Sequence, residues 1–232
     1  MSEATDKVSG VRDLPIFPLP LVLFPGVPLP LHIFEPRYRQ MLQDIKATNN
    51  FLGVSYLEDA SEAECPAVGH VGCLAELTEA QTLDDGRSNI LTVGVIRYRV
   101  EEYLDRGDEY LLARVSFFED DEEDSNLLRT AAKDVADLFL RVARAVRAIN
   151  DERANLPNIA DTEPQRLSFL VAAAVELDLN AKQVLLELRS TAERLDRLQG
   201  VLELFVDGYE ERARVHELAK GNGHSGRKFE ME

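Results

Sequence analysis

The sequence predicts an α+β protein in which a compact, barrel-like antiparallel β-domain precedes a helical bundle. Up to residue 118, short apolar runs alternate with turn sequences, as in a sheet of short strands. Six consecutive acidic residues follow at 119–124, and beyond them apolar residues recur at helical spacing. Because the strands come before the helices and do not alternate with them, the pattern favours an α+β arrangement.

The acidic run marks the expected domain boundary. We expect a β-rich domain with one short helix at residues 1–122, a helical bundle at 123–220 and a flexible tail at 221–232. The run itself is expected to be a solvated linker, because blocks of like charge repel one another and remain in water.

An apolar stretch at residues 14–34 is long enough to suggest a membrane span. Six of the ten prolines of the chain lie within it, at positions 15, 18, 20, 25, 28 and 30. Each proline removes a backbone N–H donor and clashes with the preceding turn, so a helix cannot run through the stretch. We expect an irregular segment of strand and loop, and no membrane partner.

The rest of the β-half is predicted to contain one helix and several strands. The helix begins at Pro36, a favourable position in a first turn. Its apolar side chains share one face: Tyr38, Met41, Leu42 and Ile45. The expected strands, with a kink near Gly94, cover residues 51–57, 68–77, 90–95, 98–104 and 111–117. Turn sequences at 84–87 and 105–108 separate the later runs.

Helices are expected throughout the second half. The first is capped by Ser125 or Asn126, carries a single apolar stripe and ends before a loop at residues 150–160. The second follows a capping box formed by Thr162 and Gln165.

Two further helices are expected to complete the bundle. A short one opens at Asn180, and the last and longest opens at Ser190. The seam of the long helix alternates spacings of three and four residues, as in bundles: Leu195, Leu198, Leu202, Phe205, Tyr209 and Ala213. Its outer face could serve self-association, although such stripes usually pack within one chain.

The formal net charge of −16, from 42 acidic and 26 basic residues, opposes nucleic-acid binding. Such binding depends on Lys and Arg contacts with phosphates. Cys65 and Cys73 are too few for a disulfide framework and lack the spacing of a zinc half-site. We expect reduced thiols in a cytoplasmic protein, with a single bridge as the alternative. No signal peptide is visible in the first 13 residues.

Two groups of motifs occur in a fixed order. The first group is LPIFPL at residues 14–19, FPG at 24–26 and PLHIFEPRY at 30–38. The second group is GHVG at 69–72, DGR at 85–87 and GVIRYRV at 94–100. Together with Arg194-Leu195 and the leucine-rich helix after it, this set resembles the amino-terminal substrate-binding domain of Lon-type proteases. The resemblance extends over residues 12–215.

The resemblance implies a pseudo-barrel β-domain related in shape to PUA-like folds, with a helical bundle behind it. It also implies a recognition role, because in Lon proteases this domain helps to engage unfolded or tagged substrates and contributes to assembly. The later ATPase and peptidase domains have no counterpart here, so the chain looks like a stand-alone member of the family.

No catalytic, cofactor-binding or metal-binding residues are predicted. A Lon ATPase needs a phosphate loop containing Gly-Lys, and none of the six lysines follows a glycine. The Ser–Lys peptidase motif is absent, and the four histidines form no HExxH motif or close pair. A hydrolytic site built from His70 and a carboxylate, or from Cys73, has no local motif, and Cys73 is more typical of a core residue.

The candidate peptide-binding residues form two groups. The first is a stiff apolar loop around the Pro25-Gly26 turn, where prolines lower the entropic cost of holding an extended peptide. It comprises Leu23, Phe24, Pro25, Val27 and Leu29. The second is a polar rim that contacts a peptide carbonyl or carboxylate, and it comprises Arg37, Tyr38, Arg97 and Tyr98.

Purely structural roles are the alternative for both regions. Large apolar side chains are usually buried, so Phe17, Leu19, Leu31 and Phe34 are expected to fill the barrel. The arginines of the polar rim are expected to pair with acids such as Glu35 or Glu101 and to tie the helix to the sheet.

The leading hypothesis is a non-catalytic module that binds unfolded or partner protein segments. The alternative is an adaptor or regulator of a protease or other assembly, which acts through its helical half. Nucleic-acid binding, suggested only by the PUA-like shape, and a cryptic hydrolase are less favoured.

Overall fold

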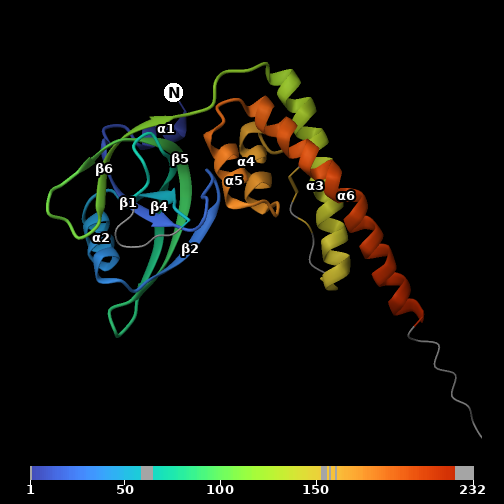
Figure 1. The fold of residues 1–232 in the computed structure, drawn as a ribbon, viewed down its shortest axis with the longest axis horizontal. Coiled ribbons are helices and arrows are strands. Elements are labelled where there is room, and N and C mark those ends of the chain that lie inside the picture. The colour runs from blue at the N-terminus through green and yellow to red at the C-terminus, as the bar shows by residue number, and fades with distance from the viewer. Residues whose placement is uncertain (1, 59–64, 153–155, 157, 160, 223–232) are drawn as a thin grey trace, which may run out of the picture. The chain divides into compact units, whose positions relative to one another are not determined.

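The computed structural model describes residues 2–58, 65–152, 156, 158–159 and 161–222 (Figure 1). The chain forms two compact units. The first comprises Met1–Glu122 and Phe169–Ser190, and the second comprises Glu123–Ser168 and Thr191–Glu232. The division expected from the sequence placed Phe169–Ser190 in the helical half, whereas the structure packs this segment into the first unit.

The strands and three of the six described helices lie in the first unit. They are α1 (Glu3–Lys7), β1 (Asp13–Leu19), β2 (Pro28–Ile33), α2 (Pro36–Ala47), β3 (Phe51–Tyr56), β4 (Val71–Thr82), β5 (Ser88–Leu104), β6 (Leu111–Phe118) and α5 (Leu179–Glu187). The second unit contains α3 (Ser125–Asn150) and α6 (Thr191–Asn222). Helix α4 (Pro164–Ala174) begins in the second unit and ends in the first.

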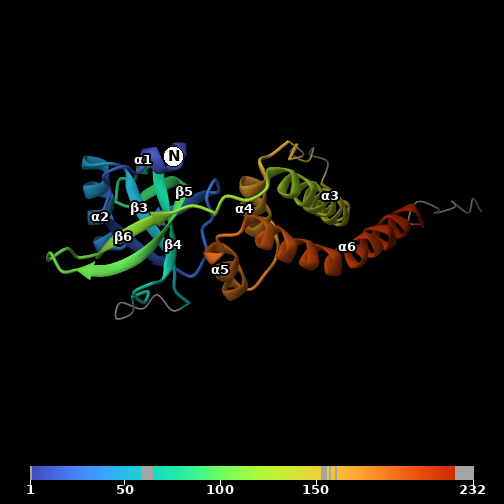
Figure 2. The ribbon, with the colours of Figure 1, turned by 90° about the horizontal axis from the view of Figure 1, so that it is seen from above.

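The six strands form one sheet in the order β2-β5-β4-β3-β1-β6, and β6 also pairs with β5. The pairings therefore close a ring of β5, β4, β3, β1 and β6, as the pseudo-barrel prediction requires (Figure 2). The α+β class is confirmed. One pairing corrects the expectation of a purely antiparallel sheet, because β1 and β3 are parallel. The segment that contains β2 and α2 returns the chain to the end from which β1 started, as a parallel crossover must.

Strand β5 is long enough to pair with two different strands along the same edge. Its residues 88–93 pair with β2, and its residues 97–104 pair with β6. The kink expected near Gly94 is a bulge, since Gly94 pairs with Ala75 and Ile96 with Leu74, which leaves Val95 as the extra residue. A β-carbon at position 94 would collide with the carbonyl group of Phe24, so only glycine fits.

Tyr98 is one of the largest side chains of the barrel interior and is fully buried. Its hydroxyl group lies 2.7 Å from Ser55 Oγ. The ring occupies the space above two glycines, because a β-carbon on Gly53 or Gly72 would overlap with it. The polar-rim assignment of Tyr98 is therefore corrected to a core role.

Arg97 is only 1% exposed and joins β5 to the segment Phe169–Ser190. Its guanidinium group donates hydrogen bonds to the carbonyl of Leu186 at 2.9 Å and to that of Leu188. It also forms an ion pair with Asp120. An acidic partner was expected, but it is Asp120 and not Glu101, and the burial corrects the assignment of Arg97 to a ligand-contacting rim.

The acidic run is not simply a solvated linker. The side chain of Asp120 is 5% exposed because it is bound to Arg97. Asp124 caps α3 by accepting hydrogen bonds from the first backbone N–H groups of the helix, a role expected of Ser125 or Asn126. Members of the run therefore fix local structure in both units.

In the second unit, α3 and α6 lie side by side and run in the same direction (Figure 1). Ion pairs join positions that are 69 residues apart: Arg141 with Glu210, and Asp151 with Lys220. The constant offset means that one register holds along most of the pair.

Helix α6 continues to Asn222, which is two residues into the tail expected at residues 221–232. Residues 223–232 lie outside the described part of the chain, as do several residues of the loop expected at 150–160. No helix among the described residues combines the length and the hydrophobicity needed to cross a membrane.

Removing the Arg97 side chain should destabilise the first unit strongly. We expect Arg97→Ala to lower the free energy of unfolding by about 3–5 kcal/mol, because it removes a buried guanidinium group that forms an ion pair with Asp120 and donates hydrogen bonds to two carbonyls. The double variant Arg97→Met/Asp120→Leu should recover part of that loss. Urea denaturation of the three proteins measures this, and a loss below about 1 kcal/mol for Arg97→Ala would contradict the assigned role.

The two cysteines should differ in reactivity. Cys65 is exposed, whereas Cys73 is fully buried and burial raises its pKa to about 12. Since the thiolate is the reactive form, the native protein at neutral pH should take up a thiol reagent at Cys65 alone. Peptide mapping by mass spectrometry reports the site, and rapid native labelling of Cys73 would contradict the buried placement. The denatured protein, labelled at both positions, is the control.

Candidate functional site

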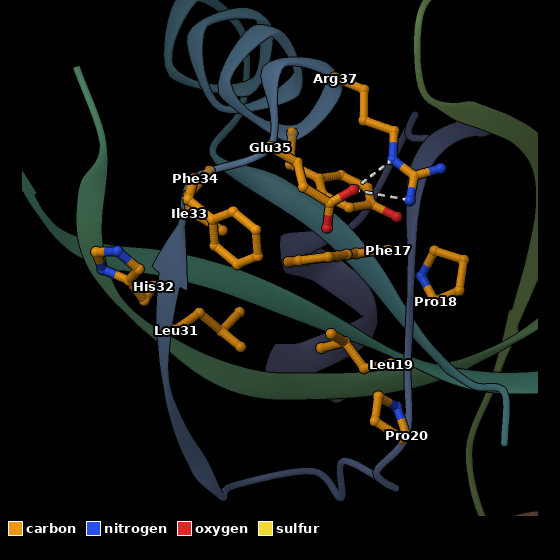
Figure 3. Close-up of a pocket in the computed structure, with 11 residues that line it drawn as sticks. Phe17, Pro18, Leu19, Pro20, Leu31, His32, Ile33, Phe34, Glu35 and Arg37 are labelled. Atoms are coloured by element: carbon orange, nitrogen blue, oxygen red, sulfur yellow. Dashed lines mark hydrogen bonds and ion pairs between the residues drawn. The ribbon is translucent and has the colours of Figure 1, made fainter. Parts of the chain in front are cut away.

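A groove of about 210 Å³ lies between the end of β1 and the end of β2, at the start of α2 (Figure 3). It lies wholly in the first unit. We call it the β1–β2 groove. The residues that line it are Phe17, Pro18, Leu19, Pro20, Leu31, His32, Ile33, Phe34, Glu35, Arg37 and Tyr38. The volume is below the roughly 300–1,000 Å³ typical of pockets for small-molecule ligands, so it suits a few side chains of a larger ligand.

Apolar side chains from both strands point into the space between β1 and β2 (Figure 3). Phe17 packs against the ring of Tyr38, with 4.1 Å between the ring centroids. Leu19 and Leu31 are half-buried around the same core cluster. Phe34 is 58% exposed, a large value for a phenylalanine, and its ring stacks on His32. The groove therefore offers an apolar floor with one accessible aromatic ring.

One end of the groove is polar. Arg37 donates from Nε to Glu35 Oε2 at 3.0 Å, and its terminal nitrogen lies 2.9 Å from the same oxygen. The Arg37 guanidinium group also lies over the Tyr38 ring, 4.6 Å from its centroid. Burial raises the pKa of Tyr38, so its phenol stays neutral. The Arg37–Glu35 pair is the one that the structural alternative predicted.

The outer edge of β2 is poor in hydrogen-bond donors. The N–H group of Gly94 donates to the carbonyl of Val27 at 3.0 Å. The backbone N–H and C=O groups of Val27 and of every second residue after it therefore point toward β5. The residues between them face away: Pro28, Pro30 and His32. Among the strands that the structure describes, β2 pairs with β5 alone. Two of the three residues on its open edge thus have no N–H group.

The end of β1 repeats this arrangement. The N–H group of Leu57 donates to the carbonyl of Leu19 at 3.0 Å, so Leu19 faces β3. Pro18 and Pro20 face the opposite way, where β6 pairs with β1 only as far as Ile16. The edge of β2 therefore presents carbonyl acceptors at exposed residues, whereas on the β1 side Pro18 is buried and Pro20 is exposed. Among these five residues His32 supplies the one N–H group.

The structure divides the residues predicted to bind a peptide. Leu23 is 3% exposed and Phe24 is fully buried, with its ring 6.1 Å from that of Phe169. These two side chains, like Arg97 and Tyr98, are not presented to a ligand, and their assignment is corrected. The neighbouring side chains of the loop are half-buried: Pro25, Val27 and Leu29. Arg37 and Tyr38 do line the groove.

The apolar lining of the groove was missed because hydrophobicity alone favours burial. Phe17 is indeed buried, but Phe34 is exposed and corrects the expectation that it fills the barrel. The available signal was the spacing of the prolines. A proline at every second position of a strand places all the missing donors on one edge, which identifies an edge that no strand covers.

The described residues contain no group of three or more His, Cys, Asp or Glu side chains placed to hold a metal ion. His70 is half-buried, and burial lowers its pKa. The high pKa of buried Cys73 opposes a role as nucleophile.

Comparison with known proteins gives one family. The model of the ATP-dependent protease La (LON) substrate-binding domain matches residues 13–221. The chain is 24% identical to the Lon protease of Brevibacillus choshinensis over 198 residues, which are 84% of this chain and 25% of that protein. It is 27% identical to the Lon protease of Escherichia coli K12 over 216 residues, which are 90% of this chain and 27% of that protein.

Solved structures show the same fold. The Lon N-terminal domain protein from Xanthomonas campestris superposes with a TM-score of 0.60 at 24% identity, covering 82% of this chain and 98% of that one. The N-terminal domain of the Mycobacterium avium complex Lon protease gives a TM-score of 0.61 at 18% identity, covering 83% and 98%. The chain spans about a quarter of the length of the curated relatives it matches. It belongs to the Lon substrate-binding domain family.

Proposed function

We propose that this chain is a non-catalytic recognition module that holds extended apolar segments of unfolded or partner proteins in the β1–β2 groove. Membership of the substrate-binding family supports a recognition role. The observation that carries the proposal is the exposed ring of Phe34 above an apolar floor, since such groupings on a protein surface mark interaction sites.

The geometry of the groove favours a polypeptide ligand over a small molecule. Its two walls are strands whose prolines fix the backbone, so little conformational entropy is lost when a ligand binds. Its small volume accommodates a few side chains while the rest of a segment remains outside. A receptor of this kind binds many sequences weakly, because it requires apolar side chains and no particular order of them.

Binding without turnover is the second part of the proposal. Within these 232 residues no lysine follows a glycine, so no phosphate loop of the Gly-Lys type occurs. The net charge of −16 favours proteins over nucleic acids as partners.

A second candidate function uses the helical unit. Several large apolar side chains of α3 and α6 are exposed: Leu127, Leu204, Val215 and Leu218. Of these, Leu204 is 81% exposed, which is unusual for a leucine on a long amphipathic helix. This surface would suit an adaptor that docks on a protease or another assembly, or self-association.

Substitution in the groove should weaken peptide binding and leave the fold intact. We expect Phe34→Ser to reduce the affinity for a short fluorescent peptide rich in leucine and phenylalanine about fivefold to tenfold, because the contact with the exposed ring is lost. Fluorescence anisotropy measures the affinity, and thermal denaturation checks the fold. Leu204→Ser, which removes an apolar side chain of α6, is the matched control and should bind normally.

The same pair of variants separates the two candidate functions. If Phe34→Ser binds the peptide as tightly as the parent while Leu204→Ser binds it less tightly, the recognition surface lies on the helical unit and the groove proposal fails.

A further inference from the structure

We propose that the β1–β2 groove prefers segments that combine a large apolar side chain with a lysine or arginine, and that it holds them through side chains and not as an added strand. This inference rests on the proposed function, because it names the class of segment that the same groove takes. It follows from the donor-poor edges of β1 and β2 and from the position of Glu35.

Strand addition requires donors and acceptors in alternation on the receiving edge. Pro18 on β1, Pro20 directly after that strand, and Pro28 and Pro30 on β2 have no N–H group to donate along the edges that border the groove. A peptide paired with either edge would place its own carbonyl groups opposite proline rings, where no N–H group can meet them. Backbone pairing is therefore incomplete on both sides of the groove.

The unpaired carbonyls of the same edges call for donors from the ligand. Lysine and arginine side chains carry several N–H donors and no acceptor, so they satisfy such a row without creating unmet acceptors of their own. A glutamate or aspartate side chain offers only acceptors and leaves these carbonyls unmet, and the guanidinium group in the lining, that of Arg37, is already paired with Glu35. The edges thus select for basic and against acidic neighbours of the apolar side chain.

Glu35 adds a charge at the polar end of the groove. Both contacts from Arg37 reach one carboxylate oxygen, Oε2. Glu35 lines the groove together with Phe17 and Phe34 (Figure 3). A cation bound there can donate to the carboxylate while its aliphatic stem packs on the rings.

The charge of the whole chain acts in the same direction. A net charge of −16 raises the local concentration of basic segments and speeds their encounter with the protein. The exposed Phe34 ring also offers a face to a guanidinium group. Short-range and long-range electrostatics therefore favour the same class of ligand.

Three matched fluorescent peptides test the inference on the full chain. The first alternates phenylalanine and arginine with serine and glycine, the second replaces arginine by glutamate, and the third is the arginine peptide with its alternate backbone nitrogens methylated. We expect the arginine peptide to bind about tenfold more tightly than the glutamate peptide. The methylated peptide should bind within about twofold of its parent, because in this inference the arginine side chains, and not the backbone N–H groups, supply most of the donors to the edge carbonyls.

Two protein variants connect the preference to the groove. Glu35→Gln should reduce the preference for arginine several-fold, whereas Glu101→Gln, an exposed carboxylate outside the groove, should leave it unchanged. Pro30→Ala restores an N–H group to the edge of β2 and should make binding sensitive to backbone methylation.

The outcomes separate this inference from the proposed function. If the arginine and glutamate peptides bind equally, or if methylation abolishes binding to the parent protein, the groove still binds peptides but the inference is overturned. If none of the peptides binds, or if Phe34→Ser does not affect any of them, both are overturned.

Discussion

The β1–β2 groove depends on the absence of backbone donors at two neighbouring strand edges. Pro18, Pro20, Pro28 and Pro30 all place their nitrogen atoms on the edges that no described strand covers. A strand cannot close the sheet across edges of this kind, because half of its hydrogen bonds would be missing. The prolines thus leave the outer edge of β2 and the end of β1 unpaired by any described strand, and protect them from indiscriminate pairing with other strands.

The rest of the first unit holds the β1–β2 groove in a fixed shape. The long strand β5 reaches β2 with one half and β6 with the other, and the bulge at Val95 allows the change of direction. Arg97, at the start of the second half, binds carbonyls of the segment Phe169–Ser190 and the carboxylate of Asp120. The buried guanidinium group of Arg97 therefore joins parts of the chain that are distant in sequence. It helps to hold together a first unit that is made of two separate segments of the chain.

Local patterns were sufficient to predict most elements. Helix α2 and the strands after it follow from apolar spacing and turn residues, and the ordered set of motifs between residues 14 and 100, with Arg194-Leu195, led to the family. Long-range pairing was not predictable in this way. Nothing in the sequence around Phe169 shows that the segment packs with the strands, and nothing near Glu119 shows that Asp120 is the partner of Arg97. These contacts depend on the tertiary fold, in which a buried guanidinium group requires an acid within reach.

The exposed residues of the candidate site were also not predictable from local sequence patterns. Phe24 and Phe34 are both phenylalanines beside prolines, yet the first is fully buried and the second is 58% exposed. Phe24 enters the core next to Gly94, whereas Phe34 follows the last residue of β2, so their difference arises from their places in the tertiary fold. Hydrophobicity alone cannot distinguish them.

The central claim is that a bound segment lies between the ends of β1 and β2. Backbone amide NMR spectra of the protein, recorded during titration with an unlabelled apolar and basic peptide, test it most directly. The account predicts that the largest shifts occur at Phe17, Leu19, Leu31 and Phe34. Shifts concentrated instead on the exposed face of α6, around Leu204 and Leu218, with these four amides unmoved, would contradict it.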